Sequence, residues 1–133
     1  MVFLDNGMIR QHDKFFQTVE SYFISSTSTE RTLFLAVILQ ALLDATQKDT
    51  NDLENAKYKR ESILWFTARF GKKREDFDYV CDLADIEPNY MRKVAMDILT
   101  SKRTNFIRSH INAILTHRDS YDRIKKNKKI KTN

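Results

Sequence analysis

The chain has 133 residues, about the size of one domain, of which 31% are charged and 41% hydrophobic. It holds only two glycines and one proline, whereas a β-rich fold needs turn residues about every 8 to 12 positions. Its single cysteine excludes an internal disulfide and a cysteine-rich zinc site. We therefore predict an all-α fold: one compact domain of five or six helices over residues 1–117, followed by a basic, flexible and disordered tail over residues 118–133.

The net charge of +5 is unevenly distributed along the chain. Residues 1–87 hold 11 Lys and Arg against 15 Asp and Glu, whereas residues 88–133 hold 12 against 3. The predicted tail alone has seven basic and two acidic residues. Such separation favours binding of a polyanion to the C-terminal part.

The hydropathy pattern does not indicate a membrane protein. The N-terminal residues carry charges where a signal peptide needs an apolar segment. The longest apolar run, residues 33–45, includes Gln40 and Asp44 and is too short to span a bilayer. We expect a cytoplasmic protein with no membrane partner.

The first half of the chain predicts three helices. Residues 12–24 have an apolar face at helical spacing, with His12 as a solvated residue near its start. Residues 33–39 are apolar on every face, which predicts a central helix over residues 30–46, and Thr27 with Glu30 gives a capping box before it. A third helix is expected over residues 52–70, with Gly71 ending it.

The apolar helix at residues 30–46 has two interpretations. If the rest of the domain surrounds it, its most buried residues should include Leu35, Val37, Ile38, Leu39 and Leu42. Alternatively, part of its surface is buried against a second subunit, in a homodimer.

Residues 77–98 read as two short helices joined by a tight turn. Each has apolar residues at helical spacing on one face, and Pro88 suits the first turn of the second helix. This stretch resembles the helix-turn-helix of bacterial transcription regulators in the form LAGVSPxTVSRVL, which aligns without a gap over residues 83–94. Asp85 stands where that family usually has a glycine in the left-handed conformation. The positions that must be small or apolar for the helices to cross are Cys81, Ala84, Ile86, Met91 and Val94, and all comply.

The resemblance implies a DNA-binding motif over residues 75–100, whose second helix enters the major groove of double-stranded DNA. Asn89 would then pair with adenine, and Arg92 or Lys93 with guanine or a phosphate. Further contacts to the sugar-phosphate backbone would come from basic residues after the motif and in the tail. The expected DNA-binding residues are Asn89, Tyr90, Arg92, Lys93, Lys102, Arg103, Arg108, Lys125, Lys126, Lys128 and Lys129.

A second resemblance covers about half of the chain. An apolar helix ending in residues 41–45, then Trp65, then the pattern of residues 77–88 and Arg92, is similar to small uncharacterised proteins of phages, prophages and proteobacteria. It implies a phage or bacterial setting and no defined activity. Together the two resemblances predict a phage or bacterial transcription regulator.

One feature favours a different function. The first motif helix and its turn carry six acids that would repel phosphates: Glu75, Asp76, Asp78, Asp82, Asp85 and Glu87. The alternative is a non-enzymatic helical module or phage adaptor that binds another protein, with a structural helix pair. DNA binding loses most of its support if Asp82 and Glu87 share an exposed face with Arg92 and Lys93. RNA is a third, lower-ranked partner.

An enzyme is not expected. The sequence has no glycine-rich phosphate loop, no nucleophile with a base at motif spacing and no cluster of metal ligands. We accordingly expect no cofactor and no metal site.

Overall fold

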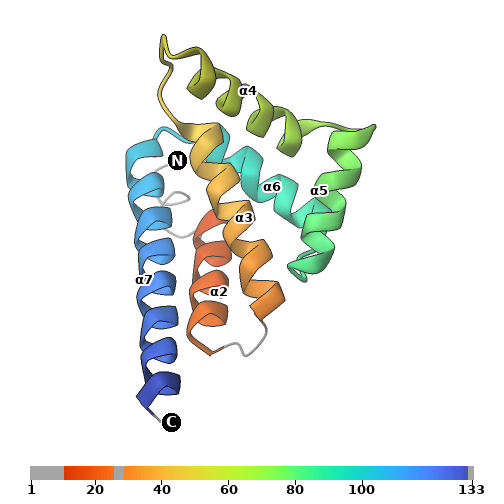
Figure 1. The fold of residues 1–133 in the computed structure, drawn as a ribbon. Coiled ribbons are helices and arrows are strands. Elements are labelled where there is room, and N and C mark those ends of the chain that lie inside the picture. The colour runs from red at the N-terminus through yellow and green to blue at the C-terminus, as the bar shows by residue number, and fades with distance from the viewer. Residues whose placement is uncertain (1–10, 26–28, 132–133) are drawn as a thin grey trace, which may run out of the picture.

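The protein is helical throughout the part that the structure describes. The computed structural model describes the backbone of residues 11–25 and 29–131, and the side chains of residues 12–24 and 29–117. These ranges form six helices and no strand (Figure 1), which confirms the predicted fold class. The helices are α2 (Gln11–Ser25), α3 (Thr29–Thr46), α4 (Leu53–Thr67), α5 (Lys72–Leu83), α6 (Pro88–Leu99) and α7 (Thr104–Lys131).

Two helices, α3 and α6, form the centre of the fold, because each contacts all five of the others. On one side, α2 and α7 pack against α3 and against each other. On the other, α4 lies across one end of α3 and leads into α5 (Figure 1). The second motif helix, α6, is therefore held from several directions at once.

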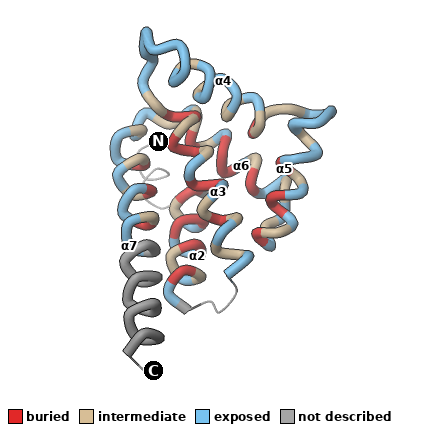
Figure 2. Tube along the Cα trace, in the orientation of Figure 1, coloured by how far each residue is buried: buried red, intermediate tan, exposed pale blue. Residues whose placement is uncertain are grey.

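The other helices surround the central helix α3 only in part. Leu35, Ile38, Leu39 and Leu42 are fully buried, but Val37 is 41% exposed, so its predicted burial is wrong. The neighbouring helices leave one strip of α3 uncovered, seen as the pale segments of that helix in Figure 2. Leu33, one turn before Val37, is 51% exposed on the same strip.

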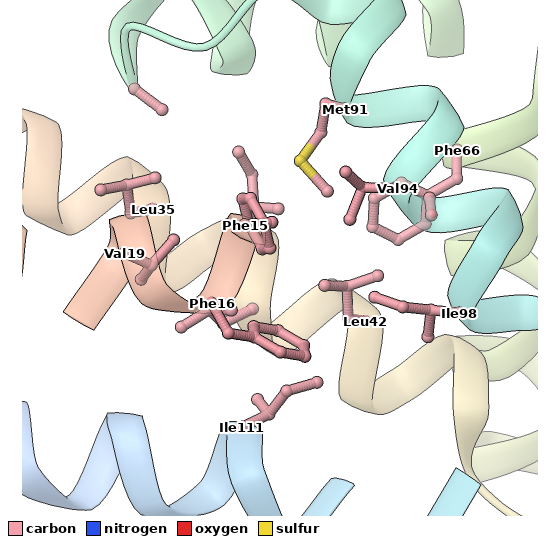
Figure 3. Packing of buried hydrophobic residues seen from close by; sticks show 14 of the residues in the cluster. Phe15, Phe16, Val19, Leu35, Leu42, Phe66, Met91, Val94, Ile98 and Ile111 are labelled. Carbon is pink, nitrogen blue, oxygen red and sulfur yellow. The ribbon is translucent and has the colours of Figure 1, made fainter. Parts of the chain in front are cut away.

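The core connects helices that are distant in sequence. Figure 3 shows Phe16 of α2, Leu42 of α3, Ile98 of α6 and Ile111 of α7 converging on one cluster of buried side chains. A second aromatic group joins α4 to α5, where the rings of Trp65, Phe66 and Phe77 meet edge to face at centroid distances of 5.0 to 6.0 Å. Edge-to-face contacts of this kind stabilise aromatic clusters beyond simple area burial.

His12 is buried rather than solvated, with 2% of its surface exposed, which corrects the prediction for this residue. Its ring nitrogen Nδ1 lies 2.5 Å from Oδ2 of Asp97 on α6. The other ring nitrogen lies 3.5 Å from Asp13. Because a buried polar ring needs partners, the carboxylate of Asp97 explains how His12 can be enclosed. The pair also fixes the start of α2 to α6.

The helix ends differ from the predicted ones at three places. The third helix stops at Thr67 instead of Phe70, and α5 starts at Lys72, one residue after Gly71. The last helix continues to Lys131, so the predicted tail overlaps its second half. Side chains from residue 118 onward lie outside the described residues, as does Thr27 of the predicted capping box. None of the described helices has the length and apolarity needed to cross a membrane.

Candidate nucleic-acid interface

The turn between α5 and α6 is short and contains one residue in the left-handed conformation. Asp85 has φ of 58°, in the left-handed region that aspartate enters more readily than most residues. The N–H of Ile86 donates to the carbonyl of Cys81 at 2.9 Å, and the N–H of Asp85 to that of Asp82 at 3.0 Å. These two bonds form a Schellman motif, which satisfies carbonyls at the end of α5. The chain therefore reverses within a few residues.

An arginine from α3 holds this turn in place. Nη2 of Arg31 lies 3.1 Å from Oδ2 of Asp85, and Nε donates to the carbonyl of Ala84 at 3.4 Å. The same guanidinium lies 3.6 Å from the ring centroid of Tyr22 on α2. A glycine at position 85 would reach the same backbone conformation without this ion pair. Sequence reasoning missed Arg31, since nothing in the local pattern links it to a turn more than 50 residues later.

The second motif helix is capped by a glutamate. The Glu87 carboxylate accepts hydrogen bonds from the backbone N–H groups of Asn89 at 3.1 Å and Tyr90 at 2.6 Å. Pro88 occupies the first helical turn, where its missing N–H costs nothing. A carboxylate at this position also complements the helix dipole. Its charge is thus committed to the helix start.

The positions at which the two helices cross are closed to solvent. Cys81, Ala84, Met91 and Val94 all have 0% of their surface exposed, and Ile86 is half-buried against the core. Burial, with smaller contributions from the charges of Asp78 and Glu87, raises the pKa of the Cys81 thiol to about 12. The five positions predicted to be small or apolar between the two helices are thus buried or half-buried.

One strip of α6 faces solvent. Asn89, Lys93 and Met96 are exposed at positions one helical turn apart, and Arg92 flanks them half-buried. With Asp97 they line one shallow depression. The side chains of Asn89, Arg92 and Lys93 make no hydrogen bond or ion pair with any other described residue. They are therefore available to a ligand.

Tyr90 lies at the edge of that strip. It is 37% exposed, and partial burial raises the pKa of its phenol. The hydroxyl is therefore neutral at physiological pH, able to donate or accept a hydrogen bond.

Most of the acids in the motif are occupied by partners within the domain. Asp76 accepts a hydrogen bond from the indole of Trp65 at 2.7 Å, and Asp78 one from Arg74 at 2.9 Å. Asp85 is paired with Arg31 and Glu87 caps α6. Of the six, only the carboxylates of Glu75 and Asp82 lack a hydrogen-bond or ion-pair partner among the described residues.

Asp82, an acid of α5 without a partner among the described residues, lines a different depression from the basic residues of α6. Asp82 and Glu87, with Tyr79 and Ile86, line a hollow on the α5 side of the turn. Arg92 and Lys93 line the depression on α6 described above, which shares no residue with that hollow. The two hollows adjoin at the start of α6, where Glu87 and Pro88 of one precede Asn89 of the other.

The other predicted cations have different environments. Lys102 is exposed after α6, and the guanidinium of Arg103 lies 4.5 Å from the ring centroid of Phe106. Arg108 turns inward, because its Nη1 donates to the carbonyl of Leu43 and, at 3.0 Å, to the hydroxyl of Thr46. It thereby caps the C-terminus of α3, and we leave it out of the proposed interface. The predicted tail residues Lys125, Lys126, Lys128 and Lys129 have side chains outside the described residues.

Among the described side chains, no group of three His, Cys, Asp or Glu residues is placed to hold a metal ion. Nε2 of His110, on α7, lies within hydrogen-bond distance, 2.8 Å, of Oε1 of Glu20 on α2.

Comparison with known proteins gives no relative for this chain. No protein-family model, no curated protein sequence and no solved structure matches it. The helix pair must therefore be interpreted from its own geometry.

Proposed function

We propose that the protein binds double-stranded DNA through α5 and α6, as a transcription regulator of a phage or bacterium acting in the cytoplasm. The observation that carries the proposal is the combination of the Asp85 turn with the unpaired strip of Asn89, Arg92 and Lys93 on α6. In helix-turn-helix proteins the first residues of the second helix contact base edges. Asn89, Arg92 and Lys93 lie within the first two turns of α6.

The chemistry of the strip suits a base edge. The amide of Asn89 can accept from N6 and donate to N7 of adenine, and Lys93, one turn later, can donate to guanine or to a phosphate. Lys102 and Arg103 follow directly after α6 and fit phosphate contacts, which set orientation rather than sequence.

The test starts with selection of bound sequences from a random duplex pool by the purified full-length protein. Asn89→Ala and Lys93→Ala should then each weaken binding to the selected duplex by about 1–3 kcal/mol and leave binding to a scrambled duplex nearly unchanged. Lys57→Ala, an exposed lysine on α4, is the matched control and should change neither. Absence of an enriched sequence, with both variants equal to the control, would reject specific DNA recognition.

The same selection addresses oligomeric state. Two inverted half-sites about 34–36 Å apart would indicate a homodimer. The uncovered strip of α3, with Leu33 and Val37, is the surface we propose for such a dimer. A single asymmetric site, with a monomeric mass in solution at the binding concentration, would reject the dimer.

A second candidate function is favoured by the hollow on the α5 side of the turn. Tyr79 is 62% exposed there beside Asp82 and the apolar Ile86, a combination suited to a basic protein segment. Asp82→Asn separates the two functions. If the protein binds DNA, this change should leave binding equal or slightly stronger, because it removes a negative charge. If the hollow is the working surface, duplex binding should be absent and capture of a basic protein partner should be lost with Asp82→Asn.

A further inference from the structure

The turn between α4 and α5 carries an exposed aromatic ring among unpaired cations. Phe70 is 87% exposed, the most exposed large hydrophobic residue in the described part of the chain. Arg69, Lys72 and Lys73 are at least partly exposed on either side of it, and their charged groups bond no other described residue. Gly71, at φ of 86°, turns the chain between them. We name residues 69–73 the Phe70 turn.

The position of Phe70 is not explained by packing. The aromatic cluster of Trp65, Phe66 and Phe77 closes the core just inside the turn, and Phe70 is not one of its members. Figure 1 shows the link from α4 to α5 at an outer corner of the molecule, away from the central helices. A ring held in water at a corner, with three cations within three positions of it, offers an apolar surface and phosphate-binding groups together.

We propose that the Phe70 turn is a second DNA contact, in the minor groove beside the major groove that α6 occupies. This inference rests on the proposed function. The 12 residues of α5 separate the Phe70 turn from the Asp85 turn by about 18 Å along the helix. The major groove is only about 12 Å wide, so the Phe70 turn can reach beyond the phosphate strand that borders it.

Each side chain of the Phe70 turn has a role in this contact. Lys72 and Lys73 neutralise phosphates of the bordering strand, and Arg69 enters the minor groove, whose negative potential is strongest in narrow A·T-rich sequence. Phe70 inserts as an apolar wedge at a flexible base step and partly unstacks it. The contact therefore adds a preference for A·T-rich, deformable sequence flanking the site that α6 reads.

The charges around the Phe70 turn leave it basic. Asp78 is paired with Arg74, so the three cations Arg69, Lys72 and Lys73 outnumber the two remaining nearby acids, Glu75 and Asp76. An anionic membrane would also attract these cations. DNA is favoured because one ring gives little area for insertion into lipid, and because α5 connects this turn directly to the candidate recognition helix.

The experiment uses the full chain and the selected duplex, with 2-aminopurine placed at single steps in the flanks. Wild-type protein should raise the probe's fluorescence at one flanking step, because that base unstacks. Phe70→Ala should abolish the rise and weaken binding at least about 5-fold. Leu53→Ala, which truncates a side chain 86% exposed on α4, is the matched control and should do neither.

The cations are tested separately by a salt titration. The double variant Lys72→Gln/Lys73→Gln should flatten the slope of log K against log salt by about 1.8, or about 0.9 for each phosphate that is no longer neutralised. Lys57→Gln, at an exposed lysine on α4 and away from the Phe70 turn, should leave the slope unchanged. Circular dichroism of every variant checks that the fold is retained.

Three outcomes would overturn the inference in distinguishable ways. If Phe70→Ala and the double lysine variant match their controls while Asn89→Ala still loses the selected site, the proposed function stands and the second contact is wrong. If wild-type protein binds phosphatidylserine vesicles and only that binding depends on Phe70, the turn is a membrane contact. If wild-type protein binds no duplex, and Asn89→Ala therefore changes nothing, the function and the second contact both fail.

Discussion

Asp85 combines an unfavourable backbone conformation with a favourable ion pair. A side chain at φ of 58° is strained relative to glycine, although aspartate tolerates this region better than most residues. The ion pair with Arg31 offsets part of the free-energy cost of this strain. Because Asp85 is 80% exposed, the pair contributes only about 0–1 kcal/mol. The residue is thus a compromise between two small effects.

Substitutions at position 85 should separate those effects. We predict that Asp85→Gly is as stable as the wild type or slightly more so, and that Asp85→Ala lies about 1 kcal/mol below Asp85→Gly, since both variants lose the ion pair and only alanine keeps the strain. Urea unfolding of the three proteins gives the order. Equal stability of the alanine and glycine variants would show that this backbone is not left-handed in solution.

Cys81 should be unreactive in the folded protein. Its side chain is fully buried, and burial raises the pKa of its thiol from 9.0 to about 12, so the nucleophilic thiolate is absent near neutral pH. Folding favours the protonated thiol, and this contribution to stability is present below pH 9.0 and is lost as pH rises toward about 12. We expect native labelling by a maleimide at pH 7 to be slow and limited by unfolding. The protein in denaturant is the control and should label quickly; equal rates would contradict the helix crossing.

At the scale of elements, local features could be predicted and long-range ones could not. The turn at Asp85 and the helix start at Pro88 depend on a few consecutive residues, so the sequence indicated both. The bonds from His12 to Asp97 and from Arg31 to Asp85 join helices far apart in sequence, and no periodicity encodes them. The same limit explains Val37, because an apolar residue does not reveal which of its sides a neighbouring helix will cover.

The two faces of α3 should differ in what they contribute to stability. Leu39→Ala empties a fully buried site and should cost about 2–5 kcal/mol. Val37, two residues earlier, lies on the uncovered strip and is 41% exposed. Val37→Ala should therefore cost less than about 1 kcal/mol in the monomer. Denaturant unfolding at low protein concentration measures both. A loss below about 1 kcal/mol for Leu39→Ala would mean that α3 is not central; a large, concentration-dependent loss for Val37→Ala would indicate that a second copy covers the strip.

For the whole molecule, the charge distribution and the fold divide the proposed DNA contacts into two kinds. The strip on α6 belongs to a helix that contacts every other described helix, so the backbone that carries its side chains has a fixed position. The last residues of the chain are rich in lysine, and the sequence predicts no acidic partners for these charges. Fixed groups suit sequence readout, whereas a run of lysines suits the uniform charge of phosphates.

Deleting residues 125–133 should therefore act differently from the α6 substitutions. The deletion removes five lysines, and we predict weaker binding to the selected and the scrambled duplex alike, with the slope of log K against log salt flatter by about 0.9 for each phosphate that those lysines had neutralised. Asn89→Ala and Lys93→Ala should instead keep that binding to scrambled DNA. Salt titrations of the three variants on both duplexes make the comparison. If the deletion abolishes all binding while the α6 variants change nothing, the protein attracts polyanions through its C-terminus alone, and α5 and α6 have a structural role.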